Sequence, residues 1–312
     1  MKKRIALTLA AALLLGCLTA CGGGEIAELG NDNRLSTTDP QTPSGSSDAP
    51  TGSGTTESPT ECTSGIVLET YTGDGFSLLV PQGWTISIVG DGVTFGFWMQ
   101  DPQDDTLAVF HYGKLEPFLK SEEARKSWKY WGPRTGDGTD YFGQAPVCLE
   151  KTAKGLIECM DECLAFQQYL GQSLLFPQLS NKTVISCENY SGALASEGVP
   201  ETVAVASCTT PSGRDAYLTM TAAIFDPGYL DIFEEGIDTY YMTAYEVNGI
   251  VMPQTCSEDW AKALAACAGS LQFTEEFVAR AMQQSNEQLA AIRQRSAENE
   301  ALMDALMRKW GY

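Results

Sequence analysis

Histidine is nearly absent from this chain, since His111 is the only one among 312 residues. Serine and cysteine hydrolases build their proton relay on a histidine, and zinc hydrolases commonly use two or three. His111 also directly follows the apolar run Leu107–Phe110, which has the composition of a strand. The sequence therefore argues against these classes of enzyme, and we expect His111 to be a structural residue at a strand end.

Other catalytic and binding signatures are missing as well. The chain has no Gly-x-Ser-x-Gly, no His-Glu-x-x-His, no phosphate loop, no dinucleotide fingerprint and no Cys-x-x-Cys pair. Basic residues are scarce, with 20 Lys and Arg against 40 Asp and Glu, a formal net charge of -20. Nucleic acids and other polyanions are poor partners for such a surface. We therefore predict no cofactor, no metal site and no nucleic-acid partner.

Long apolar runs are also scarce, and the one that stands out is Ile5–Leu15, preceded by three cations at residues 2–4. It is too short to span a bilayer but has the length of a signal-peptide core. A cleavage context follows it: Leu18, Thr19, Ala20 and then Cys21. In this pattern the thiol receives a diacylglycerol, and two acyl chains suffice for stable anchoring. Residues 1–20 are predicted to be a lipoprotein signal peptide, leaving Cys21 lipidated on the outer face of the cytoplasmic membrane.

Composition divides the rest of the chain into three parts. Residues 21–64 are rich in Gly, Ser, Thr, Pro and Asp, which predicts a disordered tether. Residues 65–273 carry the apolar content needed for one globular domain. Residues 274–312 are predicted to form a long amphipathic helix.

The expected secondary structure of the domain falls into three groups. Runs rich in β-branched and aromatic residues, separated by turn residues, predict strands between 65 and 113. Helical patterns follow at about 119–131 and 153–171, strand signals return between 183 and 247, and a last helix is expected at 257–269. Strands, then helices, then strands again predict an α+β fold with an antiparallel sheet and flanking helices.

Two resemblances refine this expectation. The stretch GFSLLVPQGW at 75–84 and the SLQF at 270–273 resemble the opening hairpin and closing element of the PsbP/Mog1-like α/β/α sandwich. The HYGKLEPFLKSE at 111–122, the APV at 145–147 and a Gln- and Arg-rich C-terminal helix resemble a group of uncharacterised Gram-positive lipoproteins. Members of that group often continue past the helix. The resemblance implies no catalytic residues.

Cysteine is used heavily for an exported chain. Of the ten cysteines, Cys17 leaves with the predicted signal and Cys21 is lipidated, so eight remain. An even number outside the cytoplasm favours disulfides, although eight thiols allow 105 pairings. Cys187 and Cys208 lie in consecutive strand runs joined by one loop, and they are the predicted pair. The alternative is that several of the eight are free, buried, small apolar side chains.

The predicted C-terminal helix carries an apolar stripe that needs a partner surface. The stripe includes Val278, Leu289, Ile292, Leu306 and Trp310. An isolated amphipathic helix of this kind is only marginally stable in water. We therefore expect this face to dock on the chain's own domain or on another protein.

For function, the sequence predicts a non-catalytic binding or assembly role at the cell envelope, with an envelope protein or a wall component as partner. One alternative is a glycan hydrolase, which needs two placed carboxylates and no histidine. The candidate acids for it are Asp101, Asp104, Asp105, Glu116 and Glu188. A second alternative, solute capture for a transporter, predicts two lobes and a hinge. No oligomeric state is predicted.

Overall fold

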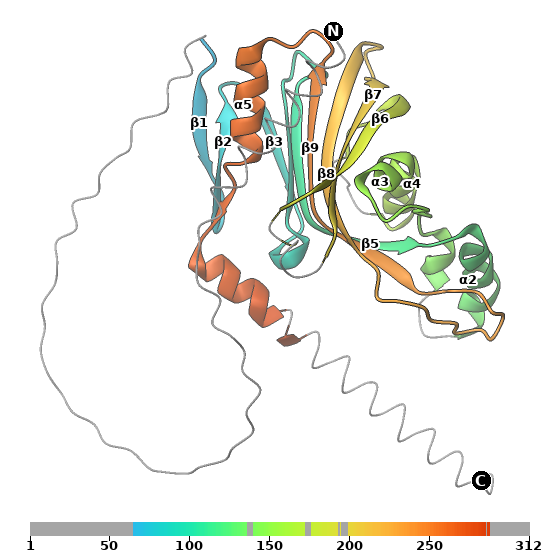
Figure 1. Ribbon diagram of the computed structural model, residues 1–312. Helices are drawn as coiled ribbons and strands as arrows, with labels where there is room; N and C mark the ends of the chain where they lie inside the picture. Colours follow the sequence, from blue (N-terminus) through green and yellow to red (C-terminus); the bar gives the residue numbers. More distant parts are fainter. Residues whose placement is uncertain are drawn as a thin grey trace, which may run out of the picture.

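The computed structural model describes residues 65–287 apart from 136–139, 172–175, 193, 195–198 and 285. Its strands form two antiparallel sheets (Figure 1). The larger has the order β3-β4-β5-β9-β8-β7-β6, with bounds Thr85–Val89, Gly96–Gln100, Ala108–Leu119, Tyr241–Pro253, Asp215–Phe225, Glu201–Thr209 and Ser180–Tyr190. The smaller has the order β1-β2-β10, with bounds Leu68–Thr72, Phe76–Pro81 and Gln272–Phe273. The described chain is therefore α+β with antiparallel sheets, as the order of the sequence patterns predicts.

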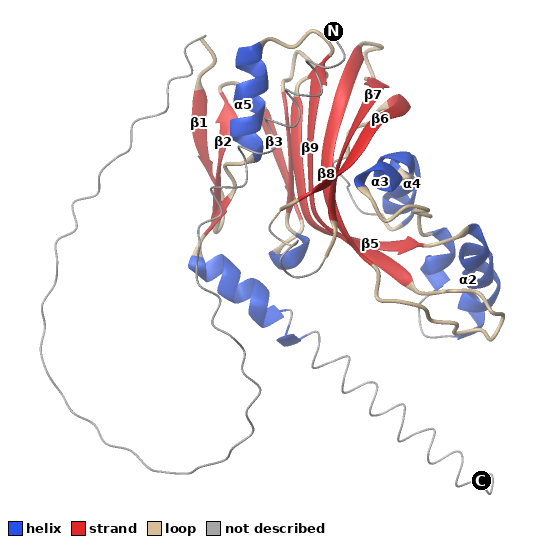
Figure 2. Cartoon of the chain, in the orientation of Figure 1, coloured by secondary structure: helices blue, strands red, loops and turns tan. Residues whose placement is uncertain are grey.

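Helices cover both faces of the larger sheet (Figure 2). The helices α3 (Ala153–Glu158) and α4 (Met160–Tyr169) pack on one face, and α5 (Glu258–Ala268) packs with the small sheet against the other. Strand β5 supplies both interfaces by alternation: Phe110 and Tyr112 point to α3, whereas Val109 points to α5. A strand that is buried on both faces explains why its sequence is a nearly continuous apolar run.

A close backbone approach in the middle of the sheet depends on one glycine. Gly249 in β9 lies opposite Phe110 in β5, and a Cβ at Gly249 would lie 2.0 Å from Cζ of the Phe110 ring. The phenylalanine ring therefore lies flat over the glycine, which fills the space that a side chain would take. This contact fixes the centre of the larger core.

The helix expected at 153–171 is two helices in the structure. Thr152 caps α3 by accepting a hydrogen bond from the Gly155 amide, and α3 ends at Cys159, whose φ of -97° and ψ of 9° interrupt the helical run. The helix expected at 119–131 begins later, as α2 (Glu122–Thr135), because β5 extends through Leu119 and two residues outside both elements follow it. The Ser121 hydroxyl accepts from the Ala124 amide at 3.1 Å and starts α2.

Beyond the end of β5, α2 and the short helix η2 (Asp140–Gln144) form a third cluster of buried residues with the segment 226–240. The Trp128 indole packs edge-on against Phe233 and donates to the Thr239 carbonyl at 3.0 Å. Phe142 from η2 packs against the same indole in a tilted arrangement, with ring centroids 4.7 Å apart. These contacts tie α2 to the loop that joins β8 to β9.

The same region is fastened by a charge cluster around Lys120. Its Nζ lies 2.6 Å from Oδ1 of Asp226 and 2.7 Å from Oδ2 of Asp238, and Lys151 also pairs with Asp226. Burial raises the pKa of Asp226, but the hydrogen bonds from Lys120 and Lys151 lower it by more, to about 2. An acid whose pKa is depressed on folding contributes stability above its unfolded pKa and loses it as the pH falls.

We therefore expect the free energy of unfolding to fall as the pH drops from about 4 towards 2. The Asp226→Asn variant should be less stable at pH 7 and should show a flatter pH dependence in that window. Urea unfolding at several pH values measures both, with Glu188→Gln as control because Glu188 is exposed on β6. An unchanged pH dependence in Asp226→Asn contradicts the assignment.

The predicted Cys187–Cys208 disulfide is wrong. Cys187 in β6 lies opposite Ala204 in β7, so Cys208 is four residues further along the partner strand. Four residues of strand span roughly 13 Å, whereas bridged cysteines have Cα atoms within about 7 Å. Consecutive strand runs suggest neighbouring strands but not which residues face each other. All seven cysteines in the described residues are free thiols, and Cys62 lies outside them.

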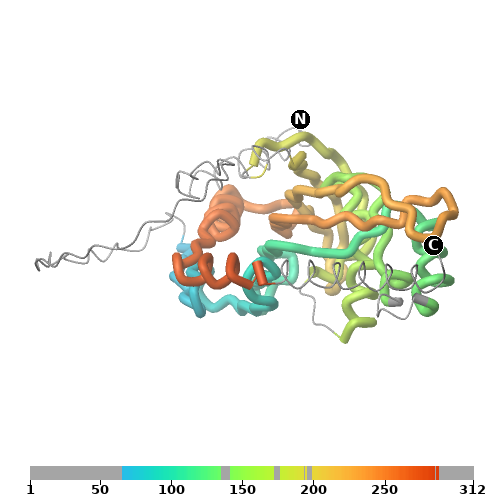
Figure 3. The backbone as a smooth tube through the Cα atoms, turned by 90° about the horizontal axis from the view of Figure 1, so that it is seen from below, coloured from blue at the N-terminus to red at the C-terminus, as the bar shows by residue number. Residues whose placement is uncertain are grey.

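The predicted docking face of the C-terminal helix is also wrong at the one residue that can be examined. Residues 275–284 are helical, but Val278 is 44% exposed whereas its neighbour Phe277 is 5% exposed. The Phe277 ring packs on Phe95 and Phe273. Figure 3 shows this helix, in red, beside the blue strands β1 and β2. The face of this helix that packs on the domain is therefore the one that carries Phe277, next to the predicted stripe.

Several predictions concern residues that the structure does not describe. The signal context of Leu18, Thr19 and Ala20, the lipidated Cys21 and the tether all lie there. So do four members of the apolar stripe: Leu289, Ile292, Leu306 and Trp310. These stay predictions.

Candidate functional site

A cleft of about 720 Å³ opens beside β5, between that strand, α4 and η2. It lies where the pairing of β5 with β9 shifts register between Leu115 and Phe118. The shift interrupts the regular ladder, so Glu116 is exposed between two buried neighbours, Leu115 and Pro117. The irregularity thus places a charged group at a cleft whose floor is apolar.

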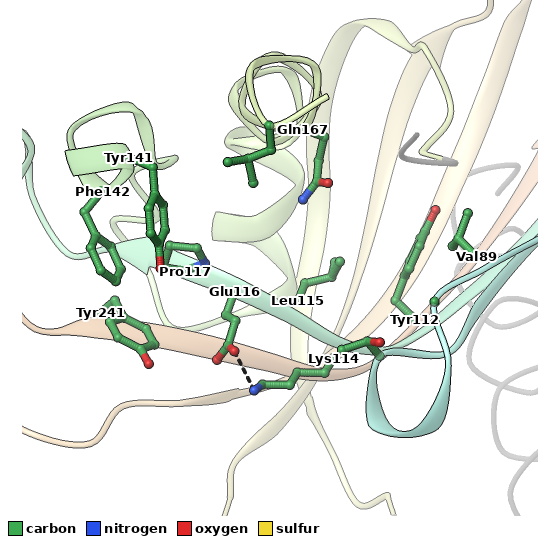
Figure 4. A pocket seen from close by; sticks show the side chains of 13 residues that line it. Val89, Tyr112, Lys114, Leu115, Glu116, Pro117, Tyr141, Phe142, Gln167 and Tyr241 are labelled. Carbon is green, nitrogen blue, oxygen red and sulfur yellow. Dashed lines mark ion pairs between the residues drawn. The ribbon is translucent and has the colours of Figure 1, made fainter. Parts of the chain in front are cut away.

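One end of the cleft is aromatic. Tyr141 and Phe142 of η2 stack on each other with ring centroids 4.6 Å apart, and Phe142 stacks on Tyr241 of β9 at 5.3 Å. Tyr112 of β5 lines the other end of the cleft (Figure 4). Both Tyr141 and Tyr241 are partly exposed, so their rings offer surface to a bound molecule.

Polar groups line the cleft around this apolar floor. Nζ of Lys114 lies 2.5 Å from Oε1 of Glu116, and the Thr243 hydroxyl donates to Oε2 of Glu116 at 3.0 Å. The side-chain amide of Gln167 in α4 lies on the opposite wall (Figure 4). Burial, and then the charge of Glu116, raise the pKa of Tyr241, so its phenol stays protonated at neutral pH. The cleft therefore carries a carboxylate, an ammonium, an amide and a phenol.

The structure does not bring the candidate acids of the hydrolase alternative together. Asp101, Asp104 and Asp105 belong to the turn between β4 and β5, and Glu188 is exposed on the edge strand β6. Of the five acids, Glu116 alone lines the cleft, and no other carboxylate is among the described residues that do so. A two-carboxylate mechanism needs a second acid about 5 to 9.5 Å away.

The acids of the β4–β5 turn have structural partners. Asp105 accepts hydrogen bonds from the Ser212 amide at 2.8 Å and from Arg214 at 2.7 Å. Burial raises the pKa of Asp105, but the bonds from Ser212 and Arg214 lower it below its usual range. Asp104 is also paired with Arg214, at 2.9 Å. These carboxylates thus join the β4–β5 turn to the β7–β8 turn.

His111 lies on the other side of the sheet from the cleft-lining Tyr112, among the residues that face α5. It is 4% exposed, its ring stacks on Phe97 at 5.9 Å, and its Nδ1 lies 2.8 Å from Oδ1 of Asn248. His111 is therefore more deeply buried than the sequence leads one to expect, and it lies within β5 and not at the end of the strand. Its structural role stays a prediction.

Sequence reasoning identified Glu116 as one acid among several and missed Tyr141, Gln167 and Tyr241. These residues come from η2, α4 and β9, which are far apart in the chain. Their neighbours in the sequence form no motif, so no local signal marks them. The stretch HYGKLEPF at 111–118, which carries one of the two resemblances, does belong to β5, the strand that forms the floor of the cleft.

The chain matches none of the protein-family profiles against which it was compared. A search of curated proteins likewise finds no significant match. No helix in the described ranges combines the length and hydrophobicity of a membrane span. Within the same residues, no three Cys, His, Asp or Glu side chains are grouped as metal ligands.

Proposed function

We propose that this protein is a lipid-anchored, extracytoplasmic lipoprotein of a Gram-positive envelope, with a non-catalytic binding role. Its lipid anchor would be Cys21, and its binding site the cleft beside β5. The cleft is the single observation that carries the binding role, since its volume, aromatic lining and few facing polar groups are typical of ligand sites. Membrane attachment is supported by the signal-like residues 1–20.

The chemistry of the cleft favours a saccharide, and we propose a segment of a wall glycan. Sugar rings present apolar C–H faces that stack on aromatic rings such as Tyr141 and Tyr241. Their hydroxyl groups pair with carboxylate, amide and ammonium groups, which Glu116, Gln167 and Lys114 supply. A neutral glycan also brings no charge that the acidic surface repels.

We further propose that the domain is a PsbP/Mog1-like sandwich within the lipoprotein group that it resembles, and that the C-terminal helix continues beyond residue 287. Helices on both faces of an antiparallel sheet support the first part. The hydrolase and solute-capture alternatives have less support. A hydrolase needs two acids, but Glu116 is the one acid among the described residues that line the cleft. A solute-capture protein needs two lobes, but the seven strands from β3 to β9 form one continuous sheet.

Binding is tested by calorimetric titration of the full mature chain with soluble N-acetylglucosamine-containing wall oligosaccharides. Tyr241→Ala and Glu116→Gln should each weaken binding by roughly ten- to a hundredfold, because burial of a ring or a charged hydrogen bond contributes about 1.5 to 3 kcal/mol. Tyr169→Ala is the matched control, since Tyr169 of α4 is 56% exposed and does not line the cleft.

Two outcomes contradict this proposal. One is the absence of any binding by the wild-type chain. The other is binding that Tyr169→Ala weakens as much as Tyr241→Ala does. Release of new reducing ends during the titration, lost in Glu116→Gln, points instead to the hydrolase alternative.

A further inference from the structure

Three cysteines belong to the buried core next to α3 and α4: Cys148 precedes α3, Cys159 lies between the two helices, and Cys163 is in α4. Cys148, Cys159 and Cys163 are all buried and belong to one apolar cluster. They lie outside the cleft, and neither the binding role nor the Cys187–Cys208 prediction accounts for them.

The backbone brings Cys148 close to α3. Its Sγ donates to the Glu150 carbonyl at 3.1 Å and lies 3.1 Å from the place that a Cβ of Gly155 would take. A Cβ at Gly155 would also lie 2.2 Å from the Glu150 carbonyl oxygen, so this approach requires glycine. Cys159 lies one helical turn after Gly155, and its amide donates to the Gly155 carbonyl at 3.1 Å. Cys148 and Cys159 therefore share one side of the helix end.

The two thiols interact directly. A hydrogen bond with Cys159, and then burial, raise the pKa of Cys148 far above its usual range. The bond with Cys148 lowers the pKa of Cys159, but Cys163 and burial raise it by more. Both groups are thus neutral thiols in contact, and in the folded state they are poor nucleophiles. Any covalent bond between them has to form while the chain folds, before burial.

Cys163 is a worse partner for Cys159 than Cys148 is. The Cys163 amide donates to the Cys159 carbonyl at 3.0 Å, so the two are related as residues i and i+4 of a helix. Such residues have Cβ atoms about 5 to 6 Å apart, whereas a disulfide needs roughly 3.5 to 4.5 Å. Cys148 approaches from another segment and has no such restriction.

We propose that Cys148 and Cys159 form a disulfide during folding, with Cys163 left as a free thiol. The two S–H bonds are lost and one S–S bond forms. The two electrons and two protons pass to the disulfide of a thiol–disulfide exchange partner, which becomes a dithiol. This inference rests on the proposed extracytoplasmic location for an oxidising environment, whereas the choice of Cys148 and Cys159 rests on their positions in the fold.

The test is to refold the reduced full mature chain in a glutathione redox buffer, block free thiols and digest without reduction. Trypsin cleavage after Lys151 and Lys154 puts Cys148 on one peptide and Cys159 with Cys163 on another. We expect these two peptides to be linked by mass spectrometry in wild type and in Cys163→Ser. The link should be absent in Cys159→Ser and in Cys148→Ser.

Stability gives a second readout that does not depend on peptide recovery. A short loop closed by a disulfide should raise the Tm by roughly 6 to 12 °C. Reduction should remove that gain in wild type and in the matched control Cys187→Ser, and should change nothing in Cys148→Ser. Because refolding takes place in vitro, it tests the pairing without reference to export. Free thiols at Cys148 and Cys159 after refolding, or a bridge that persists in Cys148→Ser, overturn the inference.

Discussion

Replacement of Phe277 by alanine is expected to lower the free energy of unfolding by about 3 kcal/mol or more, a typical cost for deleting a buried phenylalanine ring. Phe277 contacts Phe95 edge-on at 5.8 Å and stacks on Phe273 at 4.6 Å. Its Cβ also lies close to Gly75, where any side chain would collide with it. The first turn of the C-terminal helix is therefore part of the core that faces α5.

The matched control is the next residue along the same helix. Val278→Ala should change the free energy of unfolding by no more than about 0.5 kcal/mol, because Val278 is exposed. Urea denaturation of both variants measures the contrast. If both variants lose the same free energy of unfolding, the stripe that begins at Val278 also packs on the domain, as the sequence predicts. Any partner surface for the rest of that stripe stays a prediction.

The fold was predictable where local composition and packing agree. The strand runs are rich in β-branched and aromatic residues, and nearly all of them became strands. Boundaries were not predictable where tertiary contacts override the local pattern. Strand β5 continues past Lys114 and Glu116, although two charged residues are not typical of a buried strand. It does so because β9 pairs with Lys114 and Leu115 and again with Phe118, on either side of the register shift that contains Glu116.

The break between α3 and α4 is a second example. The pattern of residues 153–171 fits one helix, but Cys159 leaves helical geometry where α3 packs on the sheet. A one-residue change in direction of this kind comes from packing, and a periodicity search does not detect it. Disulfide pairing failed for a related reason, since register between β6 and β7 depends on two irregularities in their pairing.

The candidate site was less predictable than the fold. Its floor comes from one recognisable stretch around Glu116, but its walls come from η2, α4 and β9. No sequence rule indicates that Tyr141 and Tyr241 approach the same ring of Phe142. Clusters of acidic residues did not indicate the site, because the acidic β4–β5 turn, with Asp104 and Asp105, pairs with Arg214. Aromatic residues distant in sequence became a site only through the sheet that connects them.

Replacement of Cys21 by serine is expected to abolish the incorporation of labelled palmitate and to release the chain from the membrane fraction. The reason is chemical, since only a thiol forms the thioether to diacylglycerol, and serine offers a hydroxyl in its place. Two acyl chains at about 0.8 kcal/mol per buried methylene account for all of the expected attachment. The effect should therefore be all or none.

The chain supplies its own control four residues earlier. Cys17 lies inside the predicted signal, so Cys17→Ser keeps the apolar run and the Leu18-Thr19-Ala20 context and should be labelled normally. Loss of label in both variants would mean that the signal tolerates no change here, and label in both would contradict lipidation at Cys21. Normal folding of the released Cys21→Ser chain, measured by its urea midpoint, would show that the anchor acts on location alone. The binding assay can then be carried out on a soluble form with the cleft intact.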